Sequence, residues 1–508
     1  MSKKIRSDVV YSFAFQALTF LFSIFGNVYV VKKLSVEHYG VYGVLTAILT
    51  VMPTVLTVNL REYLSLKVPG INDPAKESSM LGTVNMAVMA LCAVTLLLFF
   101  LTPLKNILSH LLNLDGFHRE LYIVLFYFAV YSITANYLAY FMFTKRVKLY
   151  ALITFLITSL WCVPIIFIRM DLINIFIVRL LLLAAGTLGC IIFFFRFNRN
   201  TGLFGRFDFG FFKTSLWFGI GTYIMSLSSV FLDFIDRFML SALSSRTELA
   251  YYNFSLAPFN ILLAFITGTV FLIGAPYINE MHNKNDPRKG ELYKIALKQL
   301  TLYLLPVMVF FIAFSKQIII LLGKTEYLPV SPAYPILALV YFLMIIVAVP
   351  RQEIYVTRQL KVLSIAYAVS LGLNIGLNYF LIKAYGFTGA VWAKLIANGV
   401  LFWILAVRSK VFEAFPVSRI EIFKIACVGL LLFLAEYAVS ASLGYDRNRW
   451  VLLGLTAVSF LIFYAAYIAV NWKMDVIRKE EIRYIKDFFI MGKDMAPILR
   501  TTVKANLD

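Results

Sequence analysis

Three positively charged residues, Arg179, Arg237 and Lys394, stand inside long apolar stretches of the sequence. A charge within a membrane segment is costly, so each one marks a functional or a structural role. Arg237 follows two acids, Asp233 and Asp236, in the segment FLDFIDRF. Residues four apart share a helix face, which predicts either a structural pair between Asp233 and Arg237 or a pair that an arriving phosphate would split. Because a guanidinium grips two phosphate oxygens at once, these residues predict an anion site.

Further charged candidates stand at the ends of apolar stretches. Arg61, in the segment NLREYL, is placed to capture an anion from the cytoplasmic side, and Arg351 stands beside Glu353. Both arginines border loops, so they are also explained by membrane topology alone. Glu436 lies inside another apolar stretch, where contact with a lipid chain and packing between protein copies are equally good explanations.

No pattern of metal or nucleophilic chemistry accompanies these charges. The four cysteines lie in apolar runs without a CxxC pair, and the four histidines lack ligand spacing. The sequence contains no Walker motif, GxGxxG or HExxH. We therefore expect no cofactor, no metal and no enzymatic activity.

The elements that position these residues follow from composition. The chain has 508 residues, of which 61% are hydrophobic and 15% charged, with a mean hydropathy of +0.82. Soluble domains have about 45–50% apolar and about 25% charged residues, so a soluble globular protein is excluded. The net charge of +20 does not indicate nucleic acid here, because its meaning depends on where the charges lie.

Fourteen apolar stretches are long enough to span a bilayer, which needs about 20 residues each. We therefore predict an all-α integral membrane protein with about 14 transmembrane helices. The predicted spans are Val9–Val31, Val41–Leu60, Met80–Thr102, Leu121–Phe143, Tyr150–Ile168, Ile173–Phe195, Thr214–Leu240, Tyr251–Ala275, Gln299–Leu322, Tyr334–Val349, Leu363–Ile382, Gly389–Val407, Ile425–Leu443 and Val451–Val470.

The distribution of Lys and Arg predicts the orientation. With both termini cytoplasmic, 33 of the 47 basic residues lie on the inner side, 11 on the outer side and three within spans. Such an excess follows the positive-inside rule. The outer connections are short and carry only scattered acids, which disfavours a membrane enzyme that needs paired carboxylates.

Three landmarks repeat at an offset of about 213 residues. Tyr39 and Tyr251 each open a span, KRVKLY before the fifth span corresponds to RQLKVL before the eleventh, and Arg179 corresponds to Lys394. Because each half has six spans, the halves share one orientation and enclose a cleft between them. Arg179 and Lys394 are then expected to face each other across this cleft.

This repeat divides the chain into five parts. We predict a first six-helix lobe in 1–200, a cytoplasmic linker in 201–213, a second six-helix lobe in 214–410, an extra helix pair in 411–470 and a cytoplasmic tail in 471–508. The tail segment MDVIRKEEIRYIKDFFI is predicted to lie as an amphipathic helix on the membrane surface.

Three segments resemble the Wzx-type polysaccharide-biosynthesis flippases of the multidrug/oligosaccharidyl-lipid/polysaccharide (MOP) exporter superfamily. They are LSVEHYGVYGVLTAI (34–48), DRFMLSALSSRTELAYYNFSLAPFN (236–260) and LNIGLNYFLIKAYGFTGAVWAKLIANG (373–399). The last is the most specific, with an Asn-bearing eleventh span, a short G-x-x-G turn and a twelfth span rich in small residues. The similarity covers residues 9–407. Unlike the lipid II flippases of the superfamily, the first span has no Arg or Lys.

The resemblance implies a cavity between two lobes that opens alternately to each side of the cytoplasmic membrane. The implied substrate is an undecaprenyl-diphosphate-linked oligosaccharide, flipped outward for O-antigen, capsule or exopolysaccharide synthesis. The implied partners are this lipid, membrane lipids, a polysaccharide polymerase and glycosyltransferases, with no nucleic acid. Three rivals stay open: a cation-coupled drug or metabolite exporter, a glycan polymerase or ligase, and an unselective lipid scramblase.

Overall fold

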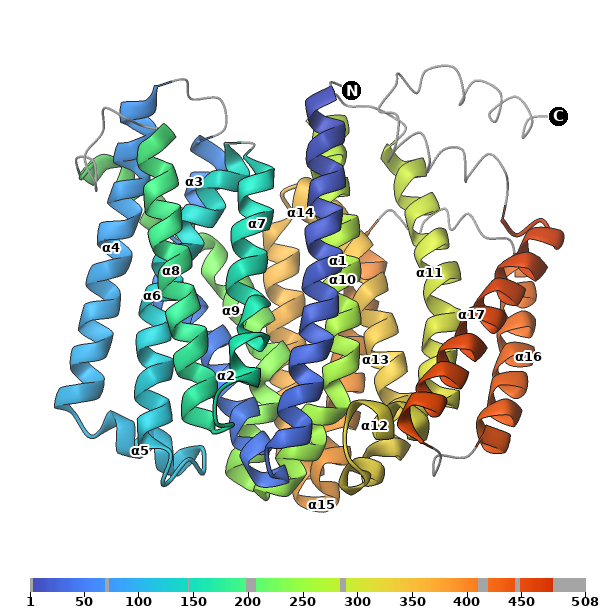
Figure 1. Cartoon of the computed structure of the whole chain (residues 1–508). Coiled ribbons are helices and arrows are strands. Elements are labelled where there is room, and N and C mark those ends of the chain that lie inside the picture. Colours follow the sequence, from blue (N-terminus) through green and yellow to red (C-terminus); the bar gives the residue numbers. More distant parts are fainter. Residues whose placement is uncertain are drawn as a thin grey trace.

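The computed structural model describes residues 3–68, 73–144, 146–197, 207–283, 289–409, 419–443 and 448–477. Across these ranges the protein consists of helices and contains no strand. Thirteen helical segments are long and apolar enough to cross a membrane. The chain is therefore a multi-pass membrane protein, and Figure 1 shows its helices as a single bundle.

The first half of the chain supplies eight α-helices and two short 3-10 turns, most of them on the left of Figure 1. These are α1 (Lys3–Lys33), α2 (Val36–Thr57), α3 (Glu62–Lys67), α4 (Pro74–Leu101), α5 (Leu104–Leu111), α6 (His118–Phe143), α7 (Val147–Thr158), η1 (Leu160–Cys162), η2 (Pro164–Ile166) and α8 (Leu172–Phe197).

The second half and the terminal pair follow. They comprise α9 (Phe209–Leu243), α10 (Arg246–Asn283), α11 (Lys289–Ala313), α12 (Ser315–Leu322), η3 (Thr325–Ala333), α13 (Tyr334–Ile346), α14 (Ala348–Val356), α15 (Leu360–Arg408), α16 (Arg419–Leu443) and α17 (Arg449–Lys473). The predicted linker lies partly, and the predicted tail mostly, outside the described residues.

A bend at Gly386 divides α15 into two spans, so the thirteen helical segments correspond to fourteen predicted spans. Residue 386 has φ +59° within the 49 residues of α15, so two arms, 360–385 and 387–408, match the eleventh and twelfth predicted spans. The Phe387 N–H donates to Glu248 Oε2 at 2.7 Å, and a Cβ at Gly386 would lie 2.2 Å from the same oxygen. Fourteen crossings result, and α1 begins at the face where α17 ends (Figure 1). We refer to that face, predicted to be cytoplasmic, as the inner face.

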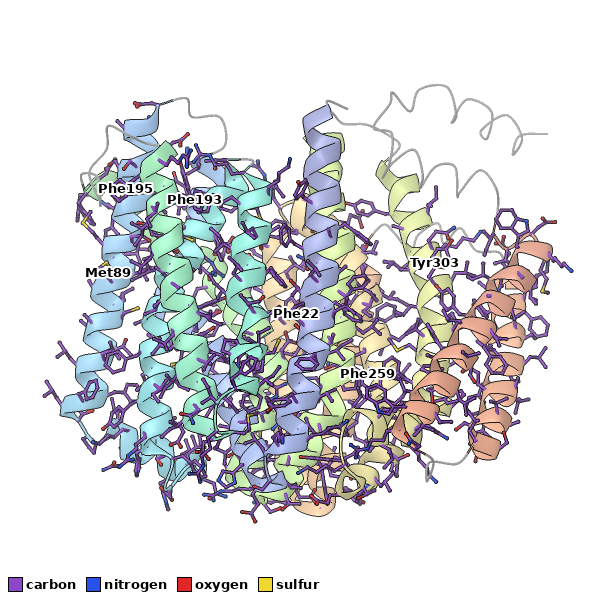
Figure 2. The ribbon with its side chains drawn as sticks, viewed as in Figure 1. Phe22, Met89, Phe193, Phe195, Phe259 and Tyr303 are labelled. Atoms are coloured by element: carbon purple, nitrogen blue, oxygen red, sulfur yellow. The ribbon has the colours of Figure 1, made fainter. Side chains whose placement is uncertain are left out.

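Lipid-facing composition and polar caps explain why these segments are helical. In hydrocarbon every backbone polar group needs an internal partner, which a helix provides. The free N–H groups at helix starts are met by side chains: Ser35 accepts from His38, Asp73 from Ala75, and Asp208 from Phe211. On the side of the bundle that Figure 2 shows, labelled apolar side chains include Met89 on α4 and Phe195 on α8.

The outer ends of the two halves meet where α2 packs against α10. A Cβ at Gly40 would lie 2.4 Å from the Arg246 carbonyl oxygen, so only glycine allows this approach. Asn253 Nδ2 donates to the Gly40 carbonyl at 3.4 Å, and Arg246 donates to the carbonyls of Asn113 (3.0 Å) and Asp115 (3.3 Å). These contacts close the seam at the outer face.

Toward the inner face, α9 joins the halves. Its first part bonds to the end of α2: Tyr223 donates to the Val55 carbonyl at 2.6 Å, and Asn59 donates to Ser226 Oγ at 2.7 Å. Its later part packs against α15. The helix thus contacts both halves, and a cavity lies where it passes from one to the other.

Candidate functional site: a cavity between the two halves

A cavity of about 340 Å³ lies between the two halves near the inner face. The end of α2 and the start of α3 form one wall, and α9, α14 and α15 form the others. Its polar and charged lining residues are Thr54, Asn59, Arg61, Glu62, Ser226, Ser229, Arg351, Gln352, Tyr355 and Tyr367. The structure therefore brings together two of the arginines that the sequence singled out, one from each half.

Arg61 is presented by a sharp turn after α2. Val58 and Asn59 have positive φ values of 47° and 53°, which end the helix three residues before the predicted boundary of the span at Leu60. The left-handed conformation is unfavourable for a β-branched residue such as Val58, so surrounding contacts must hold it. The Arg61 side chain is 41% exposed, and its Nε lies 3.9 Å from Glu62.

Arg351 approaches the cavity from α14, a short helix after a break at Val347 in the predicted tenth span. Its Nη1 donates to the Tyr367 hydroxyl at 3.4 Å. The Arg351 side chain lines the cavity and interacts electrostatically with Asp233 of α9. Neighbouring Glu353 instead accepts a hydrogen bond from Ser409.

Asp233 extends the polar surface along α9, one helical turn beyond Ser229. Lys394, Arg351, Asp236 and Arg237 all lie within electrostatic range of its carboxylate. No ion pair between Asp233 and Arg237 is formed among the described residues, so that predicted pairing is wrong.

Arg237 lies one turn further from the inner face. Its guanidinium lies 4.9 Å from the Phe234 ring centroid, and its buried Nε has no hydrogen-bond partner in the described part of the chain. Tyr39 of the first half and Tyr252 and Tyr341 of the second lie within electrostatic range. The structure thus leaves a guanidinium N–H at the interface of the two halves without an acceptor.

Lys394 pairs with Asp236, a partner that sequence reasoning did not assign. Lys394 Nζ lies 2.8 Å from Asp236 Oδ2, and the two side chains are 2% and 0% exposed. Asp236 also accepts from Tyr252 (2.6 Å) and Asn378 (2.7 Å). Lys394 is enclosed within the second half, so the expectation that it faces Arg179 across a cleft is wrong.

Arg179 lies in an aromatic setting in the first half. Its guanidinium is 4.8 Å from the Trp161 ring centroid, and its Nη1 donates to the Tyr42 hydroxyl at 3.3 Å. The contact with Trp161 is a cation–π interaction. Arg179 and Lys394 occupy corresponding positions of the repeat, but one is half-buried among aromatic rings and the other is sealed in an ion pair.

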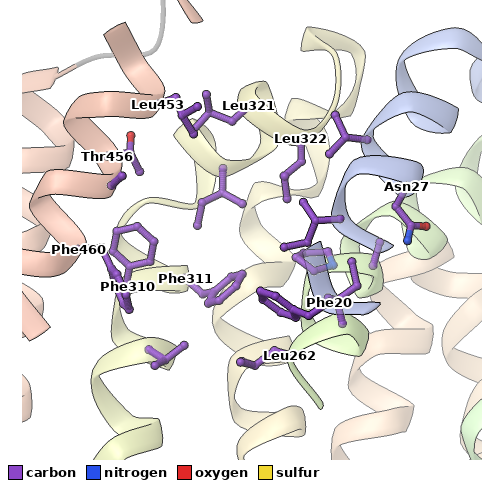
Figure 3. A pocket seen from close by; sticks show the side chains of 18 of the residues that line it. Phe20, Asn27, Leu262, Phe310, Phe311, Leu321, Leu322, Leu453, Thr456 and Phe460 are labelled. Carbon is purple, nitrogen blue, oxygen red and sulfur yellow. The ribbon is translucent and has the colours of Figure 1, made fainter. Parts of the chain in front are cut away.

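A second, apolar pocket of about 560 Å³ lies among α1, α10, α11, α12 and α17. Figure 3 shows Phe20 and Asn27 of α1 on one side and Phe310, Phe311 and Phe460 on the other. Asn27 and Thr456 are the polar residues in its lining. Glu436, on α16, is buried and does not line either of these pockets.

Several residues at these sites gave no warning in the sequence. Tyr367, Asn59 and Tyr252 are ordinary residues of their spans, and only packing brings them to the site. The asparagine at 378 carried a signal, since amides are uncommon in membrane helices and mark polar contacts. Within the described residues no group of three or more His, Cys, Asp or Glu could hold a metal.

The model of one known protein family matches more than half of the chain. Residues 31–332 match the model of a family described as polysaccharide biosynthesis protein. The chain belongs to this polysaccharide biosynthesis protein family. The match ends within η3, so the family model does not cover α13–α17. No curated protein sequence matches the chain.

Solved structures with the same fold extend the comparison beyond the family model. The lipid II flippase MurJ in an inward closed conformation shares 15% identity at a TM-score of 0.70, over 92% of this chain and 99% of that one. A MOP superfamily transporter from Pyrococcus furiosus shares 13% at 0.54, over 82% and 96%. The MATE multidrug transporter DinF-BH, in complex with R6G, shares 15% at 0.54, over 81% and 97%. The family member described here therefore has the MOP transporter fold, as the sequence predicted.

Proposed function

We propose that the protein is a flippase that moves a diphosphate-linked oligosaccharide lipid from the inner to the outer leaflet of the cell membrane. The observation that carries the proposal is the cavity in which Arg61 of the first half and Arg351 of the second meet. A diphosphate presents several anionic oxygens, and two guanidinium groups match them with charge-assisted hydrogen bonds. Membership of a polysaccharide biosynthesis family supports a saccharide cargo.

The apolar pocket gives the lipid part of the substrate a place beside the seam of the two halves. Its lining is almost free of polar groups, which suits an isoprenoid chain such as undecaprenol. An anionic head in the cavity and a chain in this pocket would keep each part of the lipid in matching surroundings. The head would then cross without entering hydrocarbon, where a bare charge is very costly.

Movement follows from alternating access between the halves 1–200 and 214–410. The substrate enters from the inner face with the outer seam closed, and transfer requires that the α2–α10 contacts open while the α9 contacts near the inner face close the cavity. We place the termini in the cytoplasm, the pair 411–470 beside the lipid chain, and the tail 471–508 on the membrane surface. The product would feed O-antigen, capsule or exopolysaccharide polymerases.

A second candidate function is the export of organic cations. Asp233, one helical turn beyond Ser229 of the cavity, favours it, because a cationic drug needs a negative partner. The lining of the cavity itself holds two arginines and one acid, Glu62, so its charge is positive and does not favour a cationic ligand. The anionic lipid is therefore the better match.

The test is transport in proteoliposomes of a fluorescent polyprenyl diphosphate carrying one N-acetylglucosamine. The wild-type protein should move the lipid, and Arg61→Gln and Arg351→Gln should each reduce the rate. A charge-assisted hydrogen bond contributes about 1.5–3 kcal/mol, which corresponds to about ten- to hundredfold in rate if the contact is lost in the transport step. Arg169→Gln, at an exposed outer loop, is the matched control. A wild-type protein that moves rhodamine-type cations but not this lipid would overturn the proposal.

A further inference from the structure

A series of tyrosines lies between Arg61 and Arg179, two arginines of the first half. Tyr150 of α7 lies within electrostatic range of both Arg61 and Tyr131. Tyr131 and Tyr127, one turn apart on α6, stack with ring centroids 6.2 Å apart and an interplanar angle of 16°. Tyr127 in turn lies within electrostatic range of Arg179 and Tyr42. We call Tyr150, Tyr131 and Tyr127 the tyrosine ladder.

The ladder runs through the interior of the first half rather than along its lipid surface. The helices that carry it, α6 and α7, pack against each other and against α8, which holds Arg179 (Figure 1). Tyr131 and Tyr150 are half-buried, and Tyr127 is 9% exposed. The rings are therefore held by packing and need no ligand to keep their positions.

Two of the three hydroxyl groups are free to bind a ligand. Tyr127 and Tyr131 neither donate nor accept a side-chain hydrogen bond with another described residue, and neither hydroxyl is among the sealed polar atoms without a partner. The Tyr150 hydroxyl interacts with the Thr154 side chain. A buried tyrosine hydroxyl ordinarily finds a protein partner. The unpaired hydroxyls of the stacked pair Tyr127 and Tyr131 therefore indicate space that a polar molecule can reach.

The chemistry of this surface matches a carbohydrate. A sugar ring has apolar C–H faces and a rim of hydroxyls, and a tyrosine offers a flat apolar face with a polar tip at low entropic cost. A neutral chain of sugars needs such surfaces rather than further charges. The arginines at the two ends of the ladder, Arg61 and Arg179, can bind the anionic diphosphate, while the tyrosines between them contact the sugars.

We infer that the tyrosine ladder is the binding surface for the saccharide part of the cargo in the first half. This inference rests on the proposed flippase function and assigns to it residues that determine which head group is accepted. Arg61 would hold the diphosphate, while the first sugars lie along Tyr150, Tyr131 and Tyr127.

Binding of two probe lipids to the detergent-purified protein tests the inference. The probes are a fluorescent polyprenyl diphosphate with one N-acetylglucosamine and the same lipid without a sugar. The wild-type protein should bind the glycosylated lipid more tightly. Tyr131→Leu, which keeps apolar volume but removes the aromatic face, should weaken binding of that lipid about tenfold, equivalent to about 1.4 kcal/mol, and leave the sugar-free lipid unchanged.

Controls separate the ladder from the proposed function and from folding. Tyr127→Phe and Tyr150→Phe retain the rings and should show a smaller loss confined to the glycosylated lipid, whereas Arg61→Gln should weaken both lipids. Tyr437→Leu, on the exposed face of α16, should change neither. Equal affinity of the wild type for the two probes, or equal loss of both in Tyr131→Leu, would overturn the ladder. Failure of the wild type to bind either probe would instead overturn the flippase proposal.

Discussion

Substituting Lys394 by methionine tests whether the cation deepest in the second half serves structure or substrate. The change removes the ammonium that lies 2.8 Å from Asp236 and leaves a fully buried carboxylate with hydrogen bonds from Tyr252 and Asn378 but no countercharge. It also frees the carbonyls of Leu232 and Asp233, to which Lys394 donates. We expect a strongly destabilised protein.

The magnitude follows from the burial of the pair. Removing one partner of a buried ion pair costs about 3–5 kcal/mol, whereas removing both charges is often nearly neutral. Lys394→Met should therefore lose about 3–5 kcal/mol of stability, and Lys394→Met combined with Asp236→Asn should recover most of it. Lys383→Met is the matched control, because Lys383 is exposed on the same helix and rests on the Tyr379 ring. Its effect should be within about 0.5 kcal/mol.

The measurement is the midpoint of chemical unfolding of each purified variant in detergent, followed by transport for those that fold. The double variant should transport at a rate near that of the wild type. Wild-type stability of Lys394→Met would refute the structural role of the pair. A stable double variant that no longer transports would show that the Lys394–Asp236 pair takes part in transport, and not in stability alone.

Three other predictions follow from the seams and the apolar pocket. Gly40→Ala places a methyl group against the Arg246 carbonyl, so it should open the outer seam. In an Asn253→Cys background it should increase labelling of that cysteine from the outside, whereas Gly454→Ala, in open surroundings, should not. Unchanged labelling with Gly40→Ala would argue against this seam as the outer gate. Glycine adopts the left-handed conformation of residue 58 without strain, so the free energy of unfolding of Val58→Gly should exceed that of Val58→Ala by about 1 kcal/mol. Equal free energies of unfolding would show that this turn is helical in the membrane. Ala457→Trp fills the apolar pocket and should slow transport of a long polyprenyl diphosphate more than that of a short one, whereas equal slowing would remove the chain from this pocket.

The apolar stretches and the repeat were sufficient to predict the fold, because in a membrane each span is specified by its own composition. The contacts of the charges were not predictable in the same way. Spacing placed Asp233 and Arg237 on one helix face, but which carboxylate meets Lys394 depends on the rotation of α9 against α15. Arg61 and Arg351 were each explained by topology alone, and only the tertiary fold brings them to one cavity.

The path of α9 constrains how the protein can move. The helix is fastened to α2 through Tyr223 and Ser226 and to α15 through Asp236, so it belongs to neither half alone. The two halves therefore cannot swing as independent rigid bodies, and α9 must flex between those anchor points. That stretch holds Ser229 and Asp233, beside the arginines of the cavity. A ligand in the cavity contacts this part of α9. Its binding and the bending of α9 are therefore coupled, and the helix transmits the change to both halves.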